Sequence, residues 1–359
     1  MSSSPVNVPV LRTVQVLGGA SGGAHVRSLA TGLAARGVRV TVCAPVEAEG
    51  EYDFTGAGAR FTPDAVSALR AACIEADVVH AHGVRAGMRA TLALRGRRIP
   101  LVVSWHGGGP GAGRLSLLLE RHVARAAAIV LGASSAQVDL ARRLGARDAR
   151  LAAVAVPVPE GPVAVPDPGD PGKVRAELGV VGRPLLIAVG SLVPRRGYSV
   201  LLDAARAWRT LDPMPLLVIA GEGPLRAELA RRIHLEGLPV RLLGRRRDAA
   251  RLLAAADVAV LSSRWEARSP LAQEALRVGV PLVATAVGGL AELVGEAGVL
   301  VPYGDPEALA AAVSGLLADP DRREALAVAG RAQAGTWPSE DDTVAQVLSV
   351  YDELVERRR

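Results

Sequence analysis

Short apolar runs alternate with amphipathic helical stretches along this 359-residue chain, and this alternation limits the fold more than any other feature. Apolar runs of strand length between helical stretches are typical of parallel strands joined by crossover helices. The sequence therefore predicts an α/β protein with doubly wound parallel sheets. In the first half we expect strands at 11–17, 38–44, 78–80, 101–105 and 129–131, and helices at 25–36, 65–76 and 115–127.

A proline-rich stretch separates two halves that each show this alternation. Residues 157–172 contain six prolines, a density that neither a helix nor a central strand tolerates. We therefore predict a linker there, a first domain over residues 1–165, a second over 166–336 and a last helical segment over 337–359. In the second half, strands are expected at 185–189, 216–220, 240–243, 258–262, 282–284 and 298–301, and helices at 200–208, 225–234 and 270–277.

The composition excludes several classes of protein. Half of the residues are apolar, which is enough for a core in each half and excludes a disordered chain or a disulfide scaffold. Mean hydropathy is +0.26, but charges interrupt every apolar run before the roughly 18 residues that a membrane-spanning helix needs. The beginning of the chain does not resemble a signal peptide. We expect Cys43 and Cys73 to be free thiols in a cytoplasmic protein.

Positive charge is concentrated in the first half of the chain. Residues 1–165 carry 18 arginines against 11 acidic residues, a net charge of +7, whereas the rest of the chain has a net charge of −1. A GC-rich genome accounts for the use of arginine over lysine but not for this uneven distribution. A basic domain favours an anionic partner, such as a phospholipid surface, a phosphorylated acceptor or a nucleic acid.

A glycine-rich loop, residues 18–23, follows the first predicted strand and precedes a helix. Its spacing differs from G-x-G-x-x-G, and residues 42–44 offer no acidic side chain for a ribose, so the sequence argues against NAD. Glycines let a ligand approach the backbone, and the amides that open the next helix favour a phosphate or another anion. The alternative is a tight turn. We favour the ligand, because a turn alone needs fewer glycines.

Two glutamates, Glu266 and Glu274, lie on either side of Pro270 after the predicted strand at 258–262. Pro270 suits the first position of a helix, so Glu266 is expected in the loop at the strand's carboxyl end and Glu274 about one turn into the helix. Their carboxylates would accept hydrogen bonds from sugar and ribose hydroxyls at the sheet edge where open α/β sheets bind ligands. Capping and solvated charges are the alternative.

Taken together, these segments resemble the retaining glycosyltransferases of family four over nearly the whole chain. The resemblance is carried by the glycine-rich loop with residues 25–30, by 77–82, 103–107 and 221–224, by the two glutamates, and by 279–285. It implies the GT-B fold, in which two Rossmann-like domains face a cleft, the first binding the acceptor and the second the nucleotide sugar. It also implies that the final helix crosses back to the first domain.

The resemblance implies a role for each matching residue. The catalytic set would be Glu266 at the donor-sugar hydroxyls, Arg196 at the diphosphate leaving group and His106 beside the reacting sugar, while Glu274 would contact the ribose. Further donor contacts would come from Gly19, Ser191, Arg195, Gly221, Glu222, Arg245, Ala267, Arg268, Ser269, Pro270 and Leu271, and acceptor contacts from Ser21, Gly22, Gly23 and His82.

The activity implied is transfer of a hexosyl residue from a nucleotide-diphosphate sugar to an acceptor hydroxyl, with retention of configuration. The product would be a cell-surface polysaccharide, a glycolipid or a small glycoside, and a UDP-sugar is favoured over GDP-mannose as the donor. No residue is placed as a nucleophile, so we expect front-face substitution without a covalent intermediate.

The chain departs from the family pattern at two places, Ser191 and residues 267–269. Ser191 stands where the family has an arginine, which removes one of two cations from the diphosphate site. Losing such a charge-assisted contact costs roughly 2 to 4 kcal/mol of transition-state stabilisation. Residues 267–269, Ala-Arg-Ser, replace Gly-Phe-Gly, so Arg195 and Arg268 are both candidates for the missing cation. The departures leave open a catalytically silent nucleotide-sugar-binding protein, and a nucleotide-sugar epimerase is the alternative with the same fold.

We expect transfer without a metal ion or a bound cofactor. The Asp-x-Asp pair Asp319 and Asp321 is interpreted as a helix cap. His80 and His82 are expected to face opposite sides of their strand, which would make them a poor metal pair.

Residues 113–127 combine leucines with Arg114, Arg121 and Arg125, and they would lie on an anionic membrane as a basic amphipathic helix. A packed crossover helix with its polar edge in water is the alternative. We expect a cytoplasmic protein, with a peripheral position at the inner face of the membrane as one option. Nucleic acid is disfavoured, because aromatic residues make up only 3% of the chain and do not alternate with basic ones.

Overall fold

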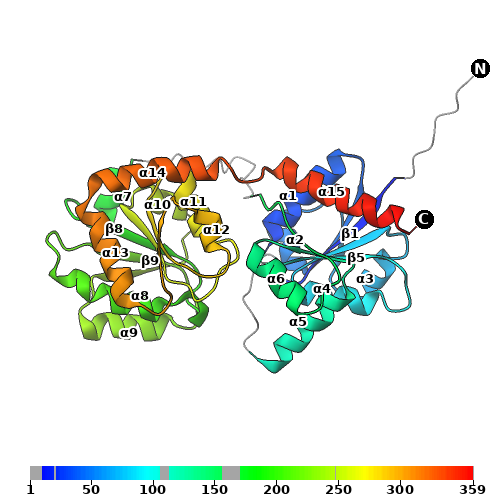
Figure 1. The fold of residues 1–359 in the computed structure, drawn as a ribbon, viewed down its shortest axis with the longest axis horizontal. Coiled ribbons are helices and arrows are strands. Elements are labelled where there is room, and N and C mark those ends of the chain that lie inside the picture. The colour runs from blue at the N-terminus through cyan, green and yellow to red at the C-terminus, as the bar shows by residue number, and fades with distance from the viewer. Residues whose placement is uncertain (1–9, 20–21, 106–112, 156–169, 247, 359) are drawn as a thin grey trace, which may run out of the picture. The chain divides into compact units, whose positions relative to one another are not determined.

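The computed structural model describes residues 10–19, 22–105, 113–155, 170–246 and 248–358. The chain forms two compact units, and each contains a parallel sheet flanked by helices (Figure 1). The first unit comprises residues 1–157 and 338–359, and the second comprises residues 158–337. The doubly wound α/β architecture predicted from the alternation of strands and helices is confirmed.

The first unit is built on a parallel sheet with strand order β3-β2-β1-β4-β5-β6-β7. Its carboxyl strand ends meet at one edge, because every neighbouring pair is parallel. The strands are β1 (Arg12–Leu17), β2 (Arg39–Ala44), β3 (Arg60–Pro63), β4 (Val78–His82), β5 (Leu101–Trp105), β6 (Ile129–Gly132) and β7 (Ala149–Leu151). The helices that connect them are α1 (Gly23–Ala35), α2 (Val46–Tyr52), α3 (Val66–Ala72), α4 (Val84–Ala93), α5 (Arg114–Ala126) and α6 (Ser135–Arg143).

The second unit is built on a parallel sheet with strand order β10-β9-β8-β11-β12-β13. Its strands are β8 (Leu185–Val189), β9 (Leu216–Ala220), β10 (Val240–Gly244), β11 (Val258–Leu261), β12 (Leu282–Thr285) and β13 (Val299–Val301). Its helices are α7 (Pro171–Glu177), α8 (Tyr198–Ala205), α9 (Arg226–Glu236), α10 (Ala249–Ala254), α11 (Pro270–Val278), α12 (Leu290–Val294), α13 (Pro306–Ala318) and α14 (Pro320–Ala334), with 3₁₀ turns at Pro194–Arg196 and Ala207–Thr210.

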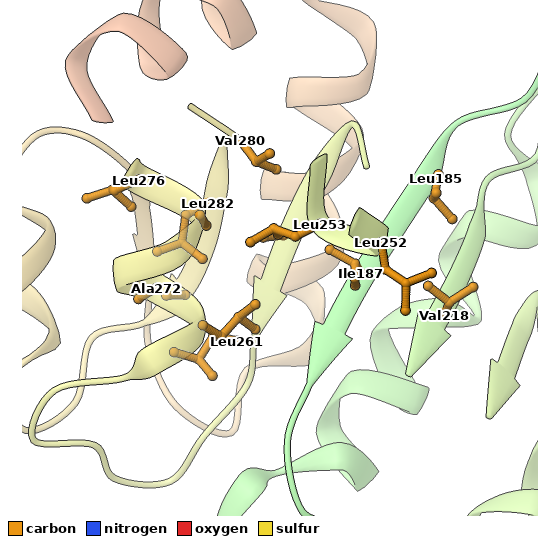
Figure 2. Packing of buried hydrophobic residues seen from close by; sticks show 14 of the residues in the cluster. Leu185, Ile187, Val218, Leu252, Leu253, Leu261, Ala272, Leu276, Val280 and Leu282 are labelled. Carbon is orange, nitrogen blue, oxygen red and sulfur yellow. The ribbon is translucent and has the colours of Figure 1, made fainter. Parts of the chain in front are cut away.

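Leucines from the helices of the second unit cover the central strands of its sheet. Leu252 and Leu253 of α10 lie over Ile187 of β8, and Leu276 of α11 packs in the same buried cluster (Figure 2). Each fully buried aliphatic side chain of this kind stabilises the fold by roughly 1.5 to 3 kcal/mol. The strands β8 and β11, whose carboxyl ends lead to the candidate site, are therefore held in a well-packed core.

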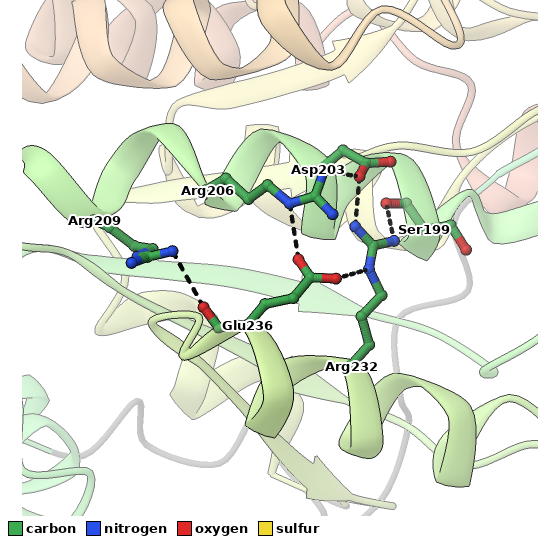
Figure 3. Close-up of polar contacts among 6 residues, drawn as sticks. All are labelled: Ser199, Asp203, Arg206, Arg209, Arg232 and Glu236. Carbon is green, nitrogen blue, oxygen red and sulfur yellow. Dashed lines mark hydrogen bonds and ion pairs between the residues drawn. The ribbon is translucent and has the colours of Figure 1, made fainter.

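Polar contacts around Glu236 join helices α8 and α9, which follow β8 and β9 (Figure 3). Glu236 accepts hydrogen bonds from Arg206 Nε at 2.8 Å and Arg232 Nε at 2.7 Å. These two guanidinium groups lower the pKa of Glu236 to about 2. Because the pKa of Glu236 is lowered, its contacts with the two arginines contribute fully to stability at pH values above the ordinary pKa of glutamate. That contribution is lost as the pH falls toward 2.

The last helix, α15 (Glu340–Glu356), packs on the first unit. It begins at Ser339, whose hydroxyl accepts from the backbone of Asp342 while the Asp342 carboxylate accepts from the backbone of Ser339. Val344 and Val347 of this helix are buried in a cluster with residues of α1, and Tyr351 is fully buried. The C-terminal segment is thus part of the first unit's core.

Several elements differ from the sequence-based expectations. The edge strands β3 and β7 and the helices α2, α4, α6, α10 and α12 were not predicted. The predicted linker is wrong at its end, because Asp170 accepts from the backbone of Gly172 and Pro171 occupies the first turn of α7. Residues 157–169 of that linker lie outside the described part of the chain.

Candidate functional site

The loops after β8, β9 and β11 meet at the carboxyl edge of the sheet in the second unit. The backbone of Leu192 donates to the carbonyl of Glu222 at 2.9 Å, and the backbone of Arg264 donates to the carbonyl of Arg195 at 2.8 Å. Strand order reverses beside β8, which lies between β9 and β11. Open α/β sheets bind their ligands at such a reversal.

Two glycines allow these loops to approach one another. A Cβ atom at Gly221 would lie 1.9 Å from the carbonyl oxygen of Gly190, and one at Gly197 would lie 1.9 Å from the carbonyl oxygen of Ser262. Gly197 also has a φ of 67°, in the left-handed region that disfavours side chains. The sequence therefore needs glycine at both positions for the loops to close on each other.

Arg196 and Glu266 form a buried ion pair at this edge, although 69 residues separate them in the chain. Their side chains are 14% and 6% exposed. Ser263 Oγ donates to Glu266 Oε1 at 2.8 Å, and Ser262 Oγ donates to the carbonyl of Arg196 at 3.0 Å. Both members of the pair are thus held in place by neighbouring hydroxyls.

The Arg196 guanidinium retains capacity for a further acceptor. Its Nε atom is buried and has no hydrogen-bond partner among the described residues. A buried donor without a partner costs about 1 to 3 kcal/mol, which an anionic oxygen at this position would offset. The structure therefore brings together a cation with a vacant donor and a carboxylate acceptor.

Glu274 lies on α11 as predicted, but its carboxylate pairs with Arg277 on the same helix, at 2.8 Å. Ser269 begins this helix by accepting from the backbone of Ala272, and Pro270 occupies its first position. Glu274 is partly buried. A ribose that used Glu274 would share the carboxylate with Arg277 or displace it.

The candidate replacement cations differ in their surroundings. Arg195 is exposed, as is Arg245 after β10, and Ser191 carries no charge. Arg268 is partly buried, and its buried Nε has no hydrogen-bond partner within the described ranges. Burial lowers the pKa of Arg268, while the Glu292 carboxylate opposes that shift. Arg268 is accordingly the candidate whose charge is least solvated.

The other predicted donor residues can contribute mainly their backbone. Ala267 and Leu271 are buried in the second unit, and the Ser269 hydroxyl is used as the helix cap. Pro270 is exposed, and Glu222 is exposed and paired with Arg226 at 2.8 Å. Backbone amides at this loop and the opening turn of α11 are suited to anionic groups.

Most glycines of the predicted anion loop in the first unit have a local structural reason. A Cβ at Gly18 would lie 2.8 Å from the backbone nitrogen of Ala86, and one at Gly23 would lie 2.3 Å from the Tyr52 ring. Gly22 begins α1 with a φ of 92°. Gly19 differs, because a Cβ there would meet nothing within 4 Å. Of the described glycines in this loop, Gly19 is the one that packing does not explain.

A cluster of histidines lies at the carboxyl edge of the first unit's sheet. The rings of His80 and His82 stack with centroids 4.4 Å apart, so the expectation that they face opposite sides is wrong. Residues two apart on a strand share a face. His82 Nε2 lies 3.0 Å from Gln15 Oε1, and the His25 ring packs edge-on against His82 at 5.7 Å.

Tyr351 of α15 completes this buried network. Its hydroxyl lies 2.7 Å from His80 Nδ1, and His80 Nε2 lies 2.7 Å from Ser104 Oγ on β5. Sequence reasoning missed Tyr351, Ser104 and Ser263. The one available signal was the spacing of Ser263 three residues before Glu266, which allows a hydroxyl within a tight loop to reach the carboxylate.

Some predicted residues fall outside the site as described. His106 and Ser21 lie outside the described residues. Asp319 caps α14 by accepting from the backbone of Arg322, in agreement with its interpretation as a cap. In the part of the chain that the structure describes, no three His, Cys, Asp or Glu side chains gather in an arrangement suited to a metal ion.

Comparison with known proteins identifies the family. Residues 183–319 match the family described as Glycosyl transferases group 1, and residues 21–157 match the Glycosyl transferase 4-like domain. The D-inositol 3-phosphate glycosyltransferase of Xylanimonas cellulosilytica is 32% identical over 311 residues, which cover 79% of this chain and 73% of that enzyme. This chain is a family-four glycosyltransferase.

Other relatives of this glycosyltransferase differ in their named donors and acceptors. The chain spans about half the length of the GDP-mannose-dependent alpha-(1-6)-phosphatidylinositol monomannoside mannosyltransferase of Mycolicibacterium smegmatis, with 34% identity over 51% of this chain and 52% of that enzyme. The solved structure of Anabaena HepE with UDP and glucose has a TM-score of 0.81 at 20% identity, over 95% of this chain and 99% of that one. That likeness confirms the GT-B fold.

Proposed function

We propose that this glycosyltransferase transfers a hexosyl residue from a nucleotide-diphosphate sugar to an acceptor hydroxyl, with retention and without a metal ion. The buried pair of Arg196 and Glu266 at the carboxyl edge of the second sheet supports the proposal most directly. It places a cation with a vacant donor next to an acceptor for sugar hydroxyls, as a sugar joined to a diphosphate requires.

Each residue of this site has a proposed task. Arg196 offsets the charge that grows on the diphosphate as it leaves, and Glu266 fixes the donor sugar through its hydroxyls. Arg268 replaces the cation missing at Ser191, because its buried Nε would gain an anionic partner. Glu274 accepts from the ribose. The backbone amide of Gly19 is a further proposed contact to the donor.

The proposed reaction needs little covalent chemistry from the protein. The bond between the anomeric carbon and the diphosphate oxygen breaks while the acceptor oxygen bonds to the same face of that carbon. The departing phosphate oxygen takes the acceptor proton, and a nucleoside diphosphate leaves. The protein accelerates the reaction by orienting the donor and the acceptor and by stabilising the charge that develops on the leaving group. The basic first unit supports an acceptor that carries phosphate or a lipid, in the synthesis of a polysaccharide, a glycolipid or a small glycoside.

Ligand-induced changes in melting temperature test the donor site. One of UDP-glucose, UDP-N-acetylglucosamine and GDP-mannose should raise Tm by about 5 °C or more at 100 times its Kd. We expect Glu274→Ala and Arg268→Ala each to remove most of that shift, and Glu228→Ala, an exposed glutamate on α9, to keep it.

The same donor is then tested in a transfer assay. Turnover should persist with a chelator, and the anomeric configuration read by NMR should be retained. Abolition by chelator would refute metal independence. A Tm shift without transfer or donor hydrolysis would identify a silent nucleotide-sugar-binding protein, and stabilisation by NAD alone would refute the donor site.

Helix α5 supports a further part of the proposal, a peripheral position on an anionic membrane. Leu115 and Leu118 are 72% and 61% exposed, and Arg114 and Arg121 beside them are exposed as well. Apolar and basic side chains on one exposed helix favour the interface of an anionic bilayer. None of the described helices is both long enough and apolar enough to span a bilayer.

Co-sedimentation with vesicles tests this surface. The protein should bind phosphatidylglycerol vesicles and not phosphatidylcholine vesicles. We expect the double variant Leu115→Ser and Leu118→Ser to bind at least about tenfold more weakly, since each loses buried apolar area in the interface. Leu235→Ser removes an equally exposed leucine from α9 of the second unit and should bind normally. Unchanged binding of the double variant would refute a role for α5.

A further inference from the structure

A cavity of about 860 Å³ lies in the first unit at the amino ends of β1, β2 and β3. It is lined by residues of the three strands, by Ala68, Ala71 and Ala72 of α3, and by Ala34 of α1 with loop residues that include Gly37 and Gly58. The candidate site residues named above lie at carboxyl strand ends, and β1 alone separates its two ends by roughly 20 Å. None of those site residues lines this cavity.

Three arginines from three adjacent strands line the cavity, and strand register places them on one face. Arg12 pairs with Arg39, and Thr41, two residues after Arg39, pairs with Arg60. Residues two apart on a strand share a face, and so do register partners on parallel strands. Val14, two residues after Arg12, packs with Leu69 of α3. All three arginine positions therefore lie on the face of the sheet that α3 covers.

These arginines have little acidic compensation. Arg12 forms an ion pair with Glu75 at 3.2 Å. Of the residues that line the cavity, Glu75 is the single acidic one, against three arginines. Arg39 and Arg60 are exposed and make no ion pair with any residue that the structure describes. Like charges on neighbouring strands destabilise a sheet. An anion bound between them would remove that cost.

The rest of the lining fits a small polar molecule attached to the anion. Thr41 and Thr62 lie on the same face as the arginines, through the pairs of Thr41 with Arg60 and Cys43 with Thr62. Their hydroxyls both donate and accept hydrogen bonds, as sugar hydroxyls do. The alanines of α3 leave the space open, and the volume is within the range of small-molecule sites.

We propose that this cavity binds a phosphorylated monosaccharide, with the phosphate held by Arg39 and Arg60 and the sugar against Thr41, Thr62 and the alanines of α3. Guanidinium groups are suited to phosphate because they donate two parallel hydrogen bonds. The site is separate from the proposed donor and acceptor sites, so its ligand binds together with a nucleotide sugar. Binding together with a nucleotide sugar rests on the proposed function, whereas binding of the phosphorylated monosaccharide does not.

Titration calorimetry with glucose 6-phosphate tests the proposal, with glucose and inorganic phosphate as comparison ligands. We expect wild-type protein to bind glucose 6-phosphate at least about tenfold more tightly than either, with or without saturating UDP. The double variant Arg39→Gln and Arg60→Gln should lose at least tenfold in affinity for glucose 6-phosphate. The matched control, Arg143→Gln and Arg147→Gln, removes the same charge from exposed positions of the same unit and should bind as wild type does.

Several results would overturn the proposal. These are an absence of glucose 6-phosphate binding, equal affinity for inorganic phosphate, unchanged affinity in the Arg39 and Arg60 variant, or competition by UDP. Binding of UDP by that variant shows that its donor site is intact, and an unchanged melting temperature shows that the first unit is folded. A failure of this proposal is thereby distinguished from a failure of the proposed donor site, which the Glu274→Ala and Arg268→Ala variants of the second unit test.

Discussion

Replacing Glu266 with alanine is expected to lower kcat/KM by about 10²- to 10³-fold and to destabilise the protein. Glu266 is buried, pairs with Arg196 and accepts from Ser263. A group that holds the donor sugar in the transition state is worth roughly 3 to 4 kcal/mol when it is removed. Loss of one member of a buried ion pair also leaves the other charge uncompensated, which costs about 3 to 5 kcal/mol of stability.

Glu266→Gln separates these two effects. It keeps the volume and one acceptor, so we expect most of the stability to return in urea unfolding while turnover stays low. Glu228→Gln, at an exposed position on α9, should match wild type in both measurements. Wild-type kcat/KM in a folded Glu266→Gln protein would show that Glu266 is a structural partner of Arg196 only.

Acid is expected to destabilise the protein through the histidine cluster of the first unit. Burial lowers the pKa of His25 from 6.5 to about 4, and burial together with the neighbouring His80 and His25 rings lowers the pKa of His82 well below 6.5. The histidines of the unfolded chain bind protons more readily than those of the folded chain. The free energy of unfolding is therefore highest above pH 6.5 and falls as the pH decreases from 6.5 toward 4. At pH 4, the lowered pKa of His25 alone would reduce the free energy of unfolding by about 3 kcal/mol. Because His25 is partly exposed, we expect a reduction of about 2 kcal/mol.

Urea unfolding at pH 7.5 and pH 5 measures this effect. We expect His25→Gln and His82→Gln each to flatten the pH dependence of the unfolding free energy, because an amide does not titrate. His122→Gln, at an exposed position on α5, should retain the full pH dependence. The same slope in all three variants would mean that groups outside the cluster are responsible.

Periodicity in the sequence was sufficient to predict the central strands. Strands such as β8 and β11 are buried along most of their length, so each appears as an apolar run bounded by turn residues. The edge strands β3 and β7 pair on one side only and are partly exposed, so they lack such a run. Their prediction required knowledge of the neighbouring strand.

The residue types of the proposed donor site could be predicted in the same way, but partners distant in the sequence, such as Arg196 and Glu266, could not. Pro270 and Ser269 begin α11 by local rules of helix capping, and these place Glu266 in the loop before it. The order of the motifs along the chain was enough to indicate the family. The pairing of Glu274 with Arg277 on one helix face was open to local reasoning, and the interpretation as a ribose ligand passed over it.

The sequence by itself determined the strand and helix alternation, the two sheets and the identity of the glutamates and arginines near the strand ends. The tertiary structure decided which side chains meet, Arg196 with Glu266 and Tyr351 with His80, and which strand positions are register partners, such as Arg12 and Arg39. The physical reason is that hydrophobic periodicity and capping act over a few residues, whereas these contacts depend on strand order and register. Those are fixed by packing of the whole unit, and no local pattern encodes them.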